Sequence, residues 1–572
     1  MRTLLLFLLL LSVSAVQSQL LIRNTTVVDV ESKKLLPNQD VLVENGTITA
    51  IGKKLNAGNA TQTIDGSGKY LMPGLVDAHV HFFQSGGLYT RPDAIDLRKY
   101  KPYEEEIKWV HNNMESFLRR YTSAGITTVV DVGANVNFLK QRDSFRTKSY
   151  APSVYMTGPL ITTWQPNELK GLEDDEPFYL MKSEADARQY VQKQLPYKPD
   201  FIKVWYIVLG KNKDSAARAN LPMVRAVIDE AHKSNLRVAV HATEQLTARL
   251  AVEAGADYLV HGVEDEPVDP AFVQLLKEKK TVLSPTLVVP GNYLKTFGQT
   301  YQPTADDFRY AHPKQLNSII DIKVIDTAIT GPYKQWITRN ADLSRKEDEL
   351  RMANLKKLLD GGVTIATGTD AGNIGTQHVS SYYDELKTMQ QSGMNTWQLL
   401  QASTINGAKA VGKEAEFGSV KKGKRADLLL LAKNPLDSIA NWQSIEWVIN
   451  KGVAVKPDSV RKPTPEELAD QQLVAYNAHN LEAFLAPYAD DVEIYDLNTN
   501  KLQVKGKEAM RKQYAFLTNI GVLHCNLLNR IVQGNVVVDH EEIWLAGGRR
   551  VYAIAIYETG DGKIKKVWFP DL

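Results

Sequence analysis

The segment Leu71-Met72-Pro73-Gly74-Leu75-Val76-Asp77-Ala78-His79-Val80-His81 decides how the rest of the chain is interpreted. It is a short apolar run that ends in two histidines one residue apart. Because alternate side chains of a strand point to the same face, His79 and His81 can present two imidazoles to one metal ion. Two histidines packed in a core would give the same pattern, so the pair alone is a weak indication.

Further potential ligands follow along the chain, each in or at the end of a later strand-like run. His241 and His261 each end an apolar run, and Asp370 follows the run at residues 365–369. Each of them alone could simply cap a strand or make a turn. With the first pair they give four neutral nitrogen ligands and one carboxylate, a set that suits zinc or a similar first-row divalent ion. Calcium or magnesium would require mostly oxygen ligands.

Lys203 lies in the apolar run Phe201-Ile202-Lys203-Val204-Trp205. A lysine in a buried strand is costly to keep charged without a partner. One interpretation is a side chain that reaches the loop face or pairs with an acid. The other is a neutral amine that has reacted with carbon dioxide, and the resulting carbamate could bridge two metals.

From about Gly74 onward, apolar strands alternate with amphipathic helices. The expected strands lie near residues 71–76, 126–132, 154–157, 201–206, 237–240, 258–260, 282–284 and 363–366. Eight strands alternating with helices predict an α/β fold, a parallel (β/α)8 TIM barrel with its chemistry at the carboxyl ends of the strands. The connection at residues 285–350 has its own helical pattern and either covers the barrel mouth or forms a surface excursion.

Short strands before and after this barrel predict a small flanking β-sandwich, in which Asn45-Gly46 indicates a hairpin. A helix at residues 468–479 and long alternating strands at 523–532, 535–544, 550–557 and 563–568 predict a separate α+β domain. The predicted domains are therefore a signal peptide at 1–18, the β-sandwich at 19–73 and 410–458, the barrel at 74–409, and a cone-shaped α+β domain at 466–572.

The first residues look like a cleaved export signal, with basic Arg2 followed by a leucine-rich run too short to span a bilayer. The remaining chain has no apolar run suited to a membrane span. A net charge of +2 over 572 residues, with no basic stripe, argues against a nucleic-acid partner. Cys525 is the only cysteine, so no intrachain disulfide can form. We expect an exported protein, periplasmic or secreted.

The chain resembles the amidohydrolase superfamily, nearest to its metal-dependent prolidase and imidazolonepropionase-related branch. The matching segments are Pro73–His81, Ile202–Val204, His241-Ala242, His261-Gly262, Thr367–Gly372, Gly418–Asp427 and Asn434–Leu436. They cover roughly residues 20 to 455, and their order along the chain makes the resemblance specific.

The resemblance implies a centre of two divalent ions, most simply zinc. In the family, His79, His81 and Asp370 would hold the more buried ion, His241 and His261 the second, and carboxylated Lys203 would bridge both. A hydroxide between the ions would attack an amide carbonyl whose oxyanion one ion stabilises. Asp370 is the candidate general base.

Two further residues are candidates for substrate contact. The resemblance favours a role for His378 near the substrate, with an exposed loop histidine as the alternative. Tyr206 could donate a hydrogen bond to the substrate carbonyl, with a packed rim tyrosine as the alternative. The chain departs from its relatives at Val260, where glutamate is common, and at residues 205–207, which replace a glycine-rich run.

The C-terminal region resembles the nuclear transport factor and ketosteroid isomerase (SnoaL-like) fold, on weaker motifs such as residues 476–484 and 488–492. Tyr495, Asp496 and His524 are possible polar groups of its pocket, although core or rim positions are the simpler expectation. We assign no chemistry to this domain from the sequence.

The sequence therefore predicts a metal-dependent hydrolase that cleaves the amide bond of a small molecule such as a dipeptide or N-acyl amino acid. A cyclic-amide hydrolase similar to imidazolonepropionase is the first alternative, and Lys203 counts against it. A non-catalytic ligand-binding protein is the second. The expected partner is a small amide, with no nucleic acid and no stable membrane span, and a homo-oligomer is compatible with the sequence.

Overall fold

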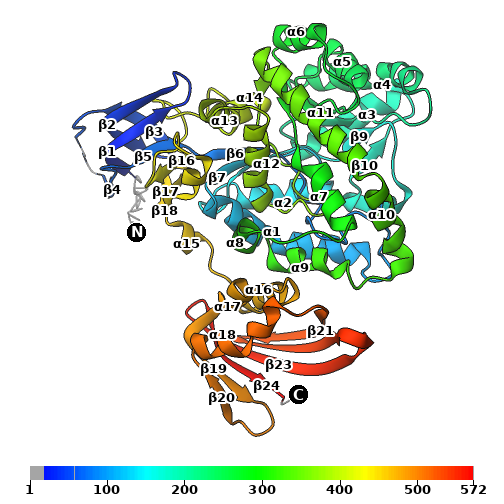
Figure 1. Ribbon diagram of the computed structural model, residues 1–572. Helices are drawn as coiled ribbons and strands as arrows, with labels where there is room; N and C mark the ends of the chain where they lie inside the picture. Colours follow the sequence, from blue (N-terminus) through cyan, green and yellow to red (C-terminus); the bar gives the residue numbers. More distant parts are fainter. Residues whose placement is uncertain (1–18, 57, 59, 571–572) are drawn as a thin grey trace, which may run out of the picture.

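The structure is a computed structural model that describes residues 19–56, 58 and 60–570. The predicted signal peptide at residues 1–18 lies outside these described residues. Figure 1 shows a small β-rich part, a large α/β part beside it, and an α+β part below. Within the described ranges, no helix combines the length and the apolar character that a membrane span requires.

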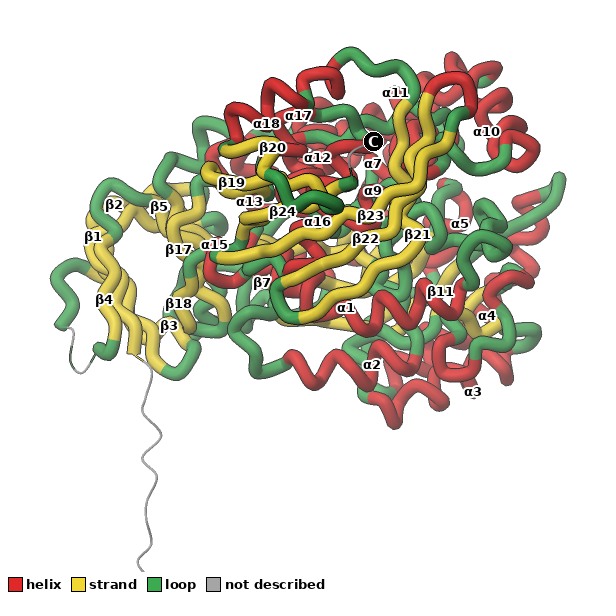
Figure 2. The backbone as a smooth tube through the Cα atoms, turned by 90° about the horizontal axis from the view of Figure 1, so that it is seen from below, coloured by secondary structure: helices red, strands yellow, loops and turns green. Residues whose placement is uncertain are grey.

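The small part is one eight-stranded sheet built from both flanks of the large part. Its strands are β1 Gln19–Asp29, β2 Lys34–Glu44, β3 Thr47–Gly52, β4 Gln62–Asp65, β5 Tyr70–Pro73, β16 Leu428–Leu431, β17 Ile445–Asn450 and β18 Val453–Val455. The order is β18-β17-β16-β5-β1-β2-β3, with β4 beside β1. Hydrogen bonding thus runs through one sheet, which Figure 2 shows curling around its own centre.

The hairpin expected at Asn45-Gly46 joins β2 to β3. Both residues have positive φ, 51° and 78°. A two-residue turn of this kind matches the twist of the flanking strands and requires left-handed backbone at both positions.

The large part contains two parallel sheets. The first has the order β6 Leu75–Val80, β7 Ile126–Asp131 and β8 Ser153–Met156. The second has the order β10 Phe178–Leu180, β9 Leu160–Thr162, β11 Ile202–Trp205, β12 Val238–His241, β13 Tyr258–Val260, β14 Val282–Ser284 and β15 Thr364–Ile365. The predicted α/β character is confirmed, while β9 and β10 were not expected.

The helices of the large part surround these sheets. They are α1 Tyr103–Ser123, α2 Val136–Arg142, α3 Glu184–Gln194, α4 Lys213–Lys233, α5 Gln245–Glu253, α6 Pro270–Lys279, α7 Val288–Phe297, α8 Ala305–Tyr310, α9 Pro313–Asp321, α10 Thr327–Arg339, α11 Ala341–Asp360, α12 Ser380–Gln391, α13 Thr396–Ala402 and α14 Ile405–Ala410. The long connection after β14 therefore forms α7 to α10 and the first half of α11.

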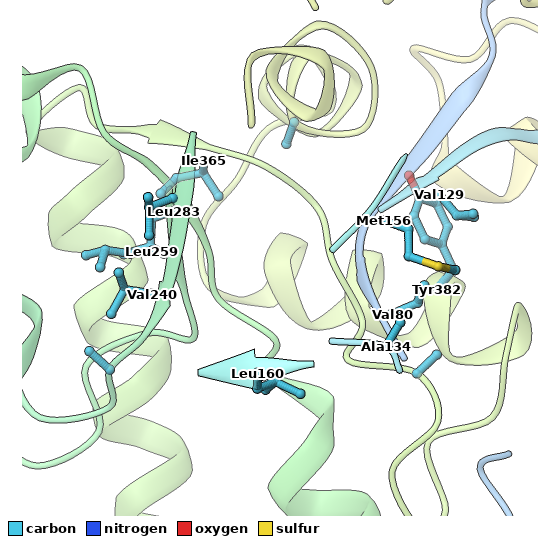
Figure 3. Packing of buried hydrophobic residues seen from close by; sticks show 14 of the residues in the cluster. Val80, Val129, Ala134, Met156, Leu160, Val240, Leu259, Leu283, Ile365 and Tyr382 are labelled. Carbon is cyan, nitrogen blue, oxygen red and sulfur yellow. The ribbon is translucent and has the colours of Figure 1, made fainter. Parts of the chain in front are cut away.

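Apolar side chains from successive strands form the core of the large part. Val240, Leu259, Leu283 and Ile365, one from each of β12 to β15, lie side by side in Figure 3 and are buried. Burying an aliphatic side chain of this size stabilises the fold by about 1.5–3 kcal/mol. The layer therefore holds the strand ends, and the polar residues that follow them, in fixed positions.

The C-terminal part contains a curved six-stranded sheet with helices on one face (Figures 1 and 2). After α15 Pro457–Val460, its elements are α16 Pro465–Asn477, α17 Leu481–Leu485, β19 Tyr488–Asp496, β20 Leu502–Lys505, α18 Lys507–Gln513, β21 Leu523–Gln533, β22 Val536–Leu545, β23 Arg550–Gly560 and β24 Lys563–Phe569. The predicted helix and the four long strands are present within a few residues. The exact domain limits remain predictions.

Candidate metal centre

The six predicted ligands lie at the carboxyl ends of the parallel strands. His79 is the second-to-last residue of β6, and His81 directly follows this strand. Lys203 and His241 are in β11 and β12, and His261 and Asp370 follow β13 and β15. A cavity of about 480 Å³ is lined by His81, Lys203, His241, His261 and Asp370. His79 contacts three of these residues, His81, His261 and Asp370.

Three potential ligands converge most closely. The Oδ1 atom of Asp370 lies 3.2 Å from His79 Nε2 and 3.1 Å from His81 Nε2. The two Nε2 atoms are 3.3 Å apart. His79 also lies beside His261, with ring centroids 5.0 Å apart, and ligand atoms of His79, His261 and Asp370 lie within 4.8 Å of one another.

The hydrogen bond of His81 indicates which kind of ligand these converging side chains suit. Its Nδ1 lies 2.9 Å from the carbonyl oxygen of Gly133, to which it can only donate. A Cβ at Gly133 would lie 2.8 Å from the His81 ring, so glycine permits this approach. The proton on Nδ1 leaves a lone pair on Nε2, directed at the Asp370 carboxylate. Converging lone pairs of this kind are satisfied by a cation, and the donor set therefore fits a divalent metal.

His261 and His241 form the second half of the group, with ring centroids 4.4 Å apart. His261 Nδ1 lies 2.7 Å from the Thr286 hydroxyl oxygen, a contact that the sequence did not suggest. His261 and Thr286 have φ of 79° and 49°, and Asp370 has φ of 56°. Left-handed backbone outside glycine is uncommon, and it concentrates at functional sites.

The charges of the group suit a cation. Burial lowers the pKa of His79 to about 4, and it also holds the pKa values of His241 and His261 well below the usual range. Burial opposes ionisation of Asp370, but His79 and His81 outweigh it and hold the pKa of that carboxyl well below its usual value. At neutral pH, His79, His241 and His261 are therefore neutral imidazoles beside one carboxylate.

Lys203 is 1% exposed, and its side chain reaches the same cavity. Burial lowers its pKa to about 7, although Asp370 and Asp131 oppose the shift. Within the described part of the chain its amine makes no ion pair shorter than 4.0 Å. Among the described residues the structure therefore shows no acid paired with Lys203, while its side chain does reach the cavity, and the carbamate stays a prediction.

Two buried acids behind the ligands were missed in the sequence. Asp77 accepts hydrogen bonds from the Thr369 main-chain NH at 3.1 Å and from its hydroxyl at 2.8 Å. Asp131 accepts from Phe82 NH at 3.0 Å and from Gly133 NH at 3.1 Å. Each of these aspartates lies within an otherwise apolar strand, and this pattern could have identified both of them in the sequence.

The rest of the cavity has an aromatic side and a polar side. Phe178 and Trp205 stack with centroids 4.9 Å apart, so the departure at residues 205–207 places an aromatic wall beside the ligands. The Arg91 guanidinium also lines the cavity, where it pairs with Asp93 at 2.6 Å and donates to the Asn373 side chain at 2.6 Å. Residues Val289, Pro290 and Tyr293 of α7 also line the cavity, so the long connection contributes to the mouth.

The two predicted substrate contacts are placed elsewhere. His378 is buried and stacked on Phe82, and its two ring nitrogens lie 2.9 Å from Tyr121 Oη and from the Gln84 carbonyl oxygen. The alternative of an exposed loop histidine is wrong. Tyr206 donates its hydroxyl proton to the Ala217 carbonyl. Because partners inside the protein engage the polar atoms of both side chains, these positions do not support a substrate contact.

In the C-terminal domain, the three candidate polar groups serve local structure. Tyr495 donates to Glu493 and stacks on Trp568. Asp496 accepts from Thr499, and His524 lies 3.1 Å from Asp321 of α9. Among the described residues that line the cavity of this domain, none of the three appears.

Comparisons with known proteins show which families the chain is similar to. The profile of the amidohydrolase family matches residues 70–455, and that of the SnoaL-like domain matches residues 469–567. An imidazolonepropionase of Geobacillus sp. (strain WCH70) is 24% identical over 412 residues, which are 69% of this chain and 84% of the relative.

Two further similarities extend the comparison. A 5-methylthioadenosine/S-adenosylhomocysteine deaminase of Caldanaerobacter subterraneus subsp. tengcongensis (strain DSM 15242 / JCM 11007 / NBRC 100824 / MB4) is 25% identical over 441 residues, 73% of this chain and 85% of the relative. The crystal structure of a Xaa-Pro dipeptidase with bound methionine superposes with a TM-score of 0.58 at 21% identity, covering 77% of this chain and all of that one.

Proposed function

Because this chain belongs to the amidohydrolase family and is a metal-dependent hydrolase acting on carbon–nitrogen bonds, we propose that it cleaves the amide bond of a dipeptide or an N-acyl amino acid. The observation that carries the proposal is the convergence of His79, His81 and Asp370 within 3.3 Å, with Lys203 opening into the same cavity.

We propose that the site holds two divalent ions, most simply zinc. His79, His81 and Asp370 are the proposed ligands of one ion, and His241 and His261 those of the other. Lys203, as a carbamate, would be shared between them. When bound, such ions supply Lewis acidity, which makes water nucleophilic near neutral pH and polarises a carbonyl.

We assign the proton transfer and the orientation of the histidine rings to residues of the protein. Asp370 is the proposed general base: its carboxylate accepts the proton of the attacking water and delivers it to the departing amine nitrogen. Thr286 and Gly133 hold the rings of His261 and His81 by their Nδ1 atoms. Held in this way, both rings keep their Nε2 lone pairs directed into the cavity.

The cavity also suggests how a substrate is oriented. Phe178 and Trp205 offer an apolar surface for a bulky side chain of the substrate. Arg91, which also lines the cavity, is held by Asp93 and Asn373, and it supplies a fixed charge for the polar end of the substrate. A solved relative that is a Xaa-Pro dipeptidase supports the choice of substrate class.

We also propose that the two parallel sheets form one closed (β/α)8 barrel. Main-chain hydrogen bonds join the segment after β15 to β6, from Ala78 to Thr367 and from His81 to Ala371, both at 2.8 Å. A bond of 2.9 Å from Asp200 to Met156 links the end of β8 to the approach to β11. These bonds support continuous strand pairing where β6 meets the segment after β15 and where β8 meets the segment before β11.

Metal analysis combined with a substrate panel tests the function. We expect about two zinc ions per chain and hydrolysis of dipeptides or N-acyl amino acids with bulky apolar side chains. One metal per chain, with hydrolysis of imidazolone propionate alone, would instead support the cyclic-amide alternative, which the curated relatives favour. A chain that binds no metal and hydrolyses nothing in the panel would be a binding protein, and the proposal would fail.

A further inference from the structure

The C-terminal domain contains a second cavity, of about 330 Å³, between its helices and the concave face of its sheet. Side chains from α16, α17, β22, β23 and β24 meet there. Six aromatic side chains contribute to its wall: Tyr476, Phe484, Tyr514, Phe516, Tyr557 and Phe569. A volume of this size is at the lower end of the range for small-molecule sites.

One ionisable acid interrupts the aromatic wall. Glu541 of β22 is buried and lines the cavity. The Tyr557 hydroxyl lies 3.3 Å from Glu541 Oε1 and donates to it, while Gln472 donates to the Tyr557 oxygen at 3.0 Å. This chain of donors runs toward the carboxyl group, which is the order that suits an ionised acceptor.

Among the described residues that line the cavity there is no lysine, arginine or histidine to balance this carboxylate. Arg530, the cation whose charge acts on Glu541, is bound by both oxygens of Asp539 at 2.7 Å and by Asp470. The surroundings of Glu541 therefore contain two acids for one base. Burial, followed by the charge of Asp539, raises the pKa of Glu541 to about 7.

We propose that this cavity binds a small organic ammonium ion, whose nitrogen pairs with Glu541 and whose apolar group contacts the aromatic wall. A buried carboxylate without a counterion is costly, and a ligand ammonium provides that counterion. Aromatic faces also attract ammonium groups, most strongly where water is excluded. This site is separate from the metal centre, and the inference does not depend on the amide-hydrolase proposal.

Calorimetric titration of the full-length, metal-loaded protein tests the proposal with a matched pair of probes. Benzylamine is charged at neutral pH, and benzyl alcohol has nearly the same shape without the charge. We expect benzylamine to bind at least about tenfold more tightly than benzyl alcohol, the size expected for a hydrogen bond to a charged group.

Two variants separate this site from amine binding at the metal centre. E541Q keeps the shape of the side chain and removes the charge, and it should weaken benzylamine binding about tenfold. E558Q, on β23 next to Tyr557, should bind as the wild type does, because Glu558 does not line the cavity. Equal affinity for both probes would indicate a neutral ligand and overturn the proposal, as would binding that is unchanged in E541Q.

A third measurement needs no variant, in case E541Q does not fold. Cys525 lines the same cavity and is the only cysteine of the chain. Saturating benzylamine should slow the alkylation of Cys525 by iodoacetamide at least severalfold, and benzyl alcohol should not. Equal rates with and without benzylamine would refute binding at this position.

Discussion

Replacing Thr286 by valine tests whether a hydroxyl outside the ligand set tunes the metal centre. Thr286 Oγ1 lies 2.7 Å from His261 Nδ1. If His261 binds the metal through Nε2, as proposed, its ring proton is on Nδ1 and the Thr286 oxygen accepts it. Valine keeps the volume and the branching at Cβ. Backbone strain at φ 49° is therefore similar in both proteins, and the substitution removes the acceptor alone.

The expected loss of metal affinity in T286V follows from two independent considerations. Removing a hydrogen-bond partner of a metal-binding histidine typically costs 10- to 100-fold in metal affinity, which corresponds to about 1.4–2.7 kcal/mol. Leaving the part-buried His261 NH without an acceptor costs up to about 1–3 kcal/mol, the range for a fully buried group. The two ranges overlap, and we expect T286V to bind its more weakly held ion about 10- to 100-fold less tightly.

The assay is a zinc titration of metal-stripped protein in competition with a chromogenic chelator. Thr281→Val is the matched control, because Thr281 is also buried and also flanks β14, but its hydroxyl bonds the Ala256 carbonyl at 3.3 Å, away from the metal ligands. Zinc affinity in T286V within twofold of the wild type would refute the reasoning. So would an equal loss in T281V.

Three further predictions concern other parts of the molecule. Replacing Lys203 by alanine should abolish hydrolysis, and short-chain carboxylic acids such as propionate should restore part of the rate; full activity without the acid would contradict the bridging role. At the junction with the C-terminal domain, burial raises the pKa of Glu467, but Arg120 and His312 outweigh it and lower the pKa from 4.5 to about 2. The ionised group then contributes stability that is fully present above about pH 4.5 and is lost as the pH falls through about 2. In urea denaturation, E467Q should therefore lose about 3 kcal/mol of unfolding free energy at neutral pH and much less near pH 2, and an equal loss at both pH values would contradict this. Finally, mass spectrometry of the protein exported with its natural N-terminus should show that it begins near Gln19, whereas a full-length mass would contradict the predicted signal peptide.

The sequence was most informative where periodicity and residue type agree. The long strands of the C-terminal domain alternate over ten residues or so, and their limits were predicted to within three residues. The ligand candidates were identifiable because each is a polar residue within or just after an apolar run. His241 and His261 illustrate this, since both end such runs and their rings lie 4.4 Å apart in the structure.

Other features depend on contacts that no local pattern records. Strands β9 and β10 are three residues each and lie in a segment rich in proline and glycine, so they carry too few residues to show a period. The burial of His378 depends on Phe82 and Tyr121, which are hundreds of residues away in the chain. Likewise, Thr286 looks like an ordinary turn residue until His261 is placed beside it.

The backbone of two proposed ligands is strained, and this strain costs the folded state free energy. His261 and Asp370 have φ of 79° and 56°, a conformation that costs a residue other than glycine about 1–3 kcal/mol. Such strain persists only where neighbouring structure fixes it. Here the Asp370 NH donates to the His79 carbonyl at 2.7 Å, and the His261 NH donates to the Ser284 carbonyl at 2.8 Å. Because each strained residue is bonded to an adjacent strand, the fold itself fixes the backbone of these two proposed ligands.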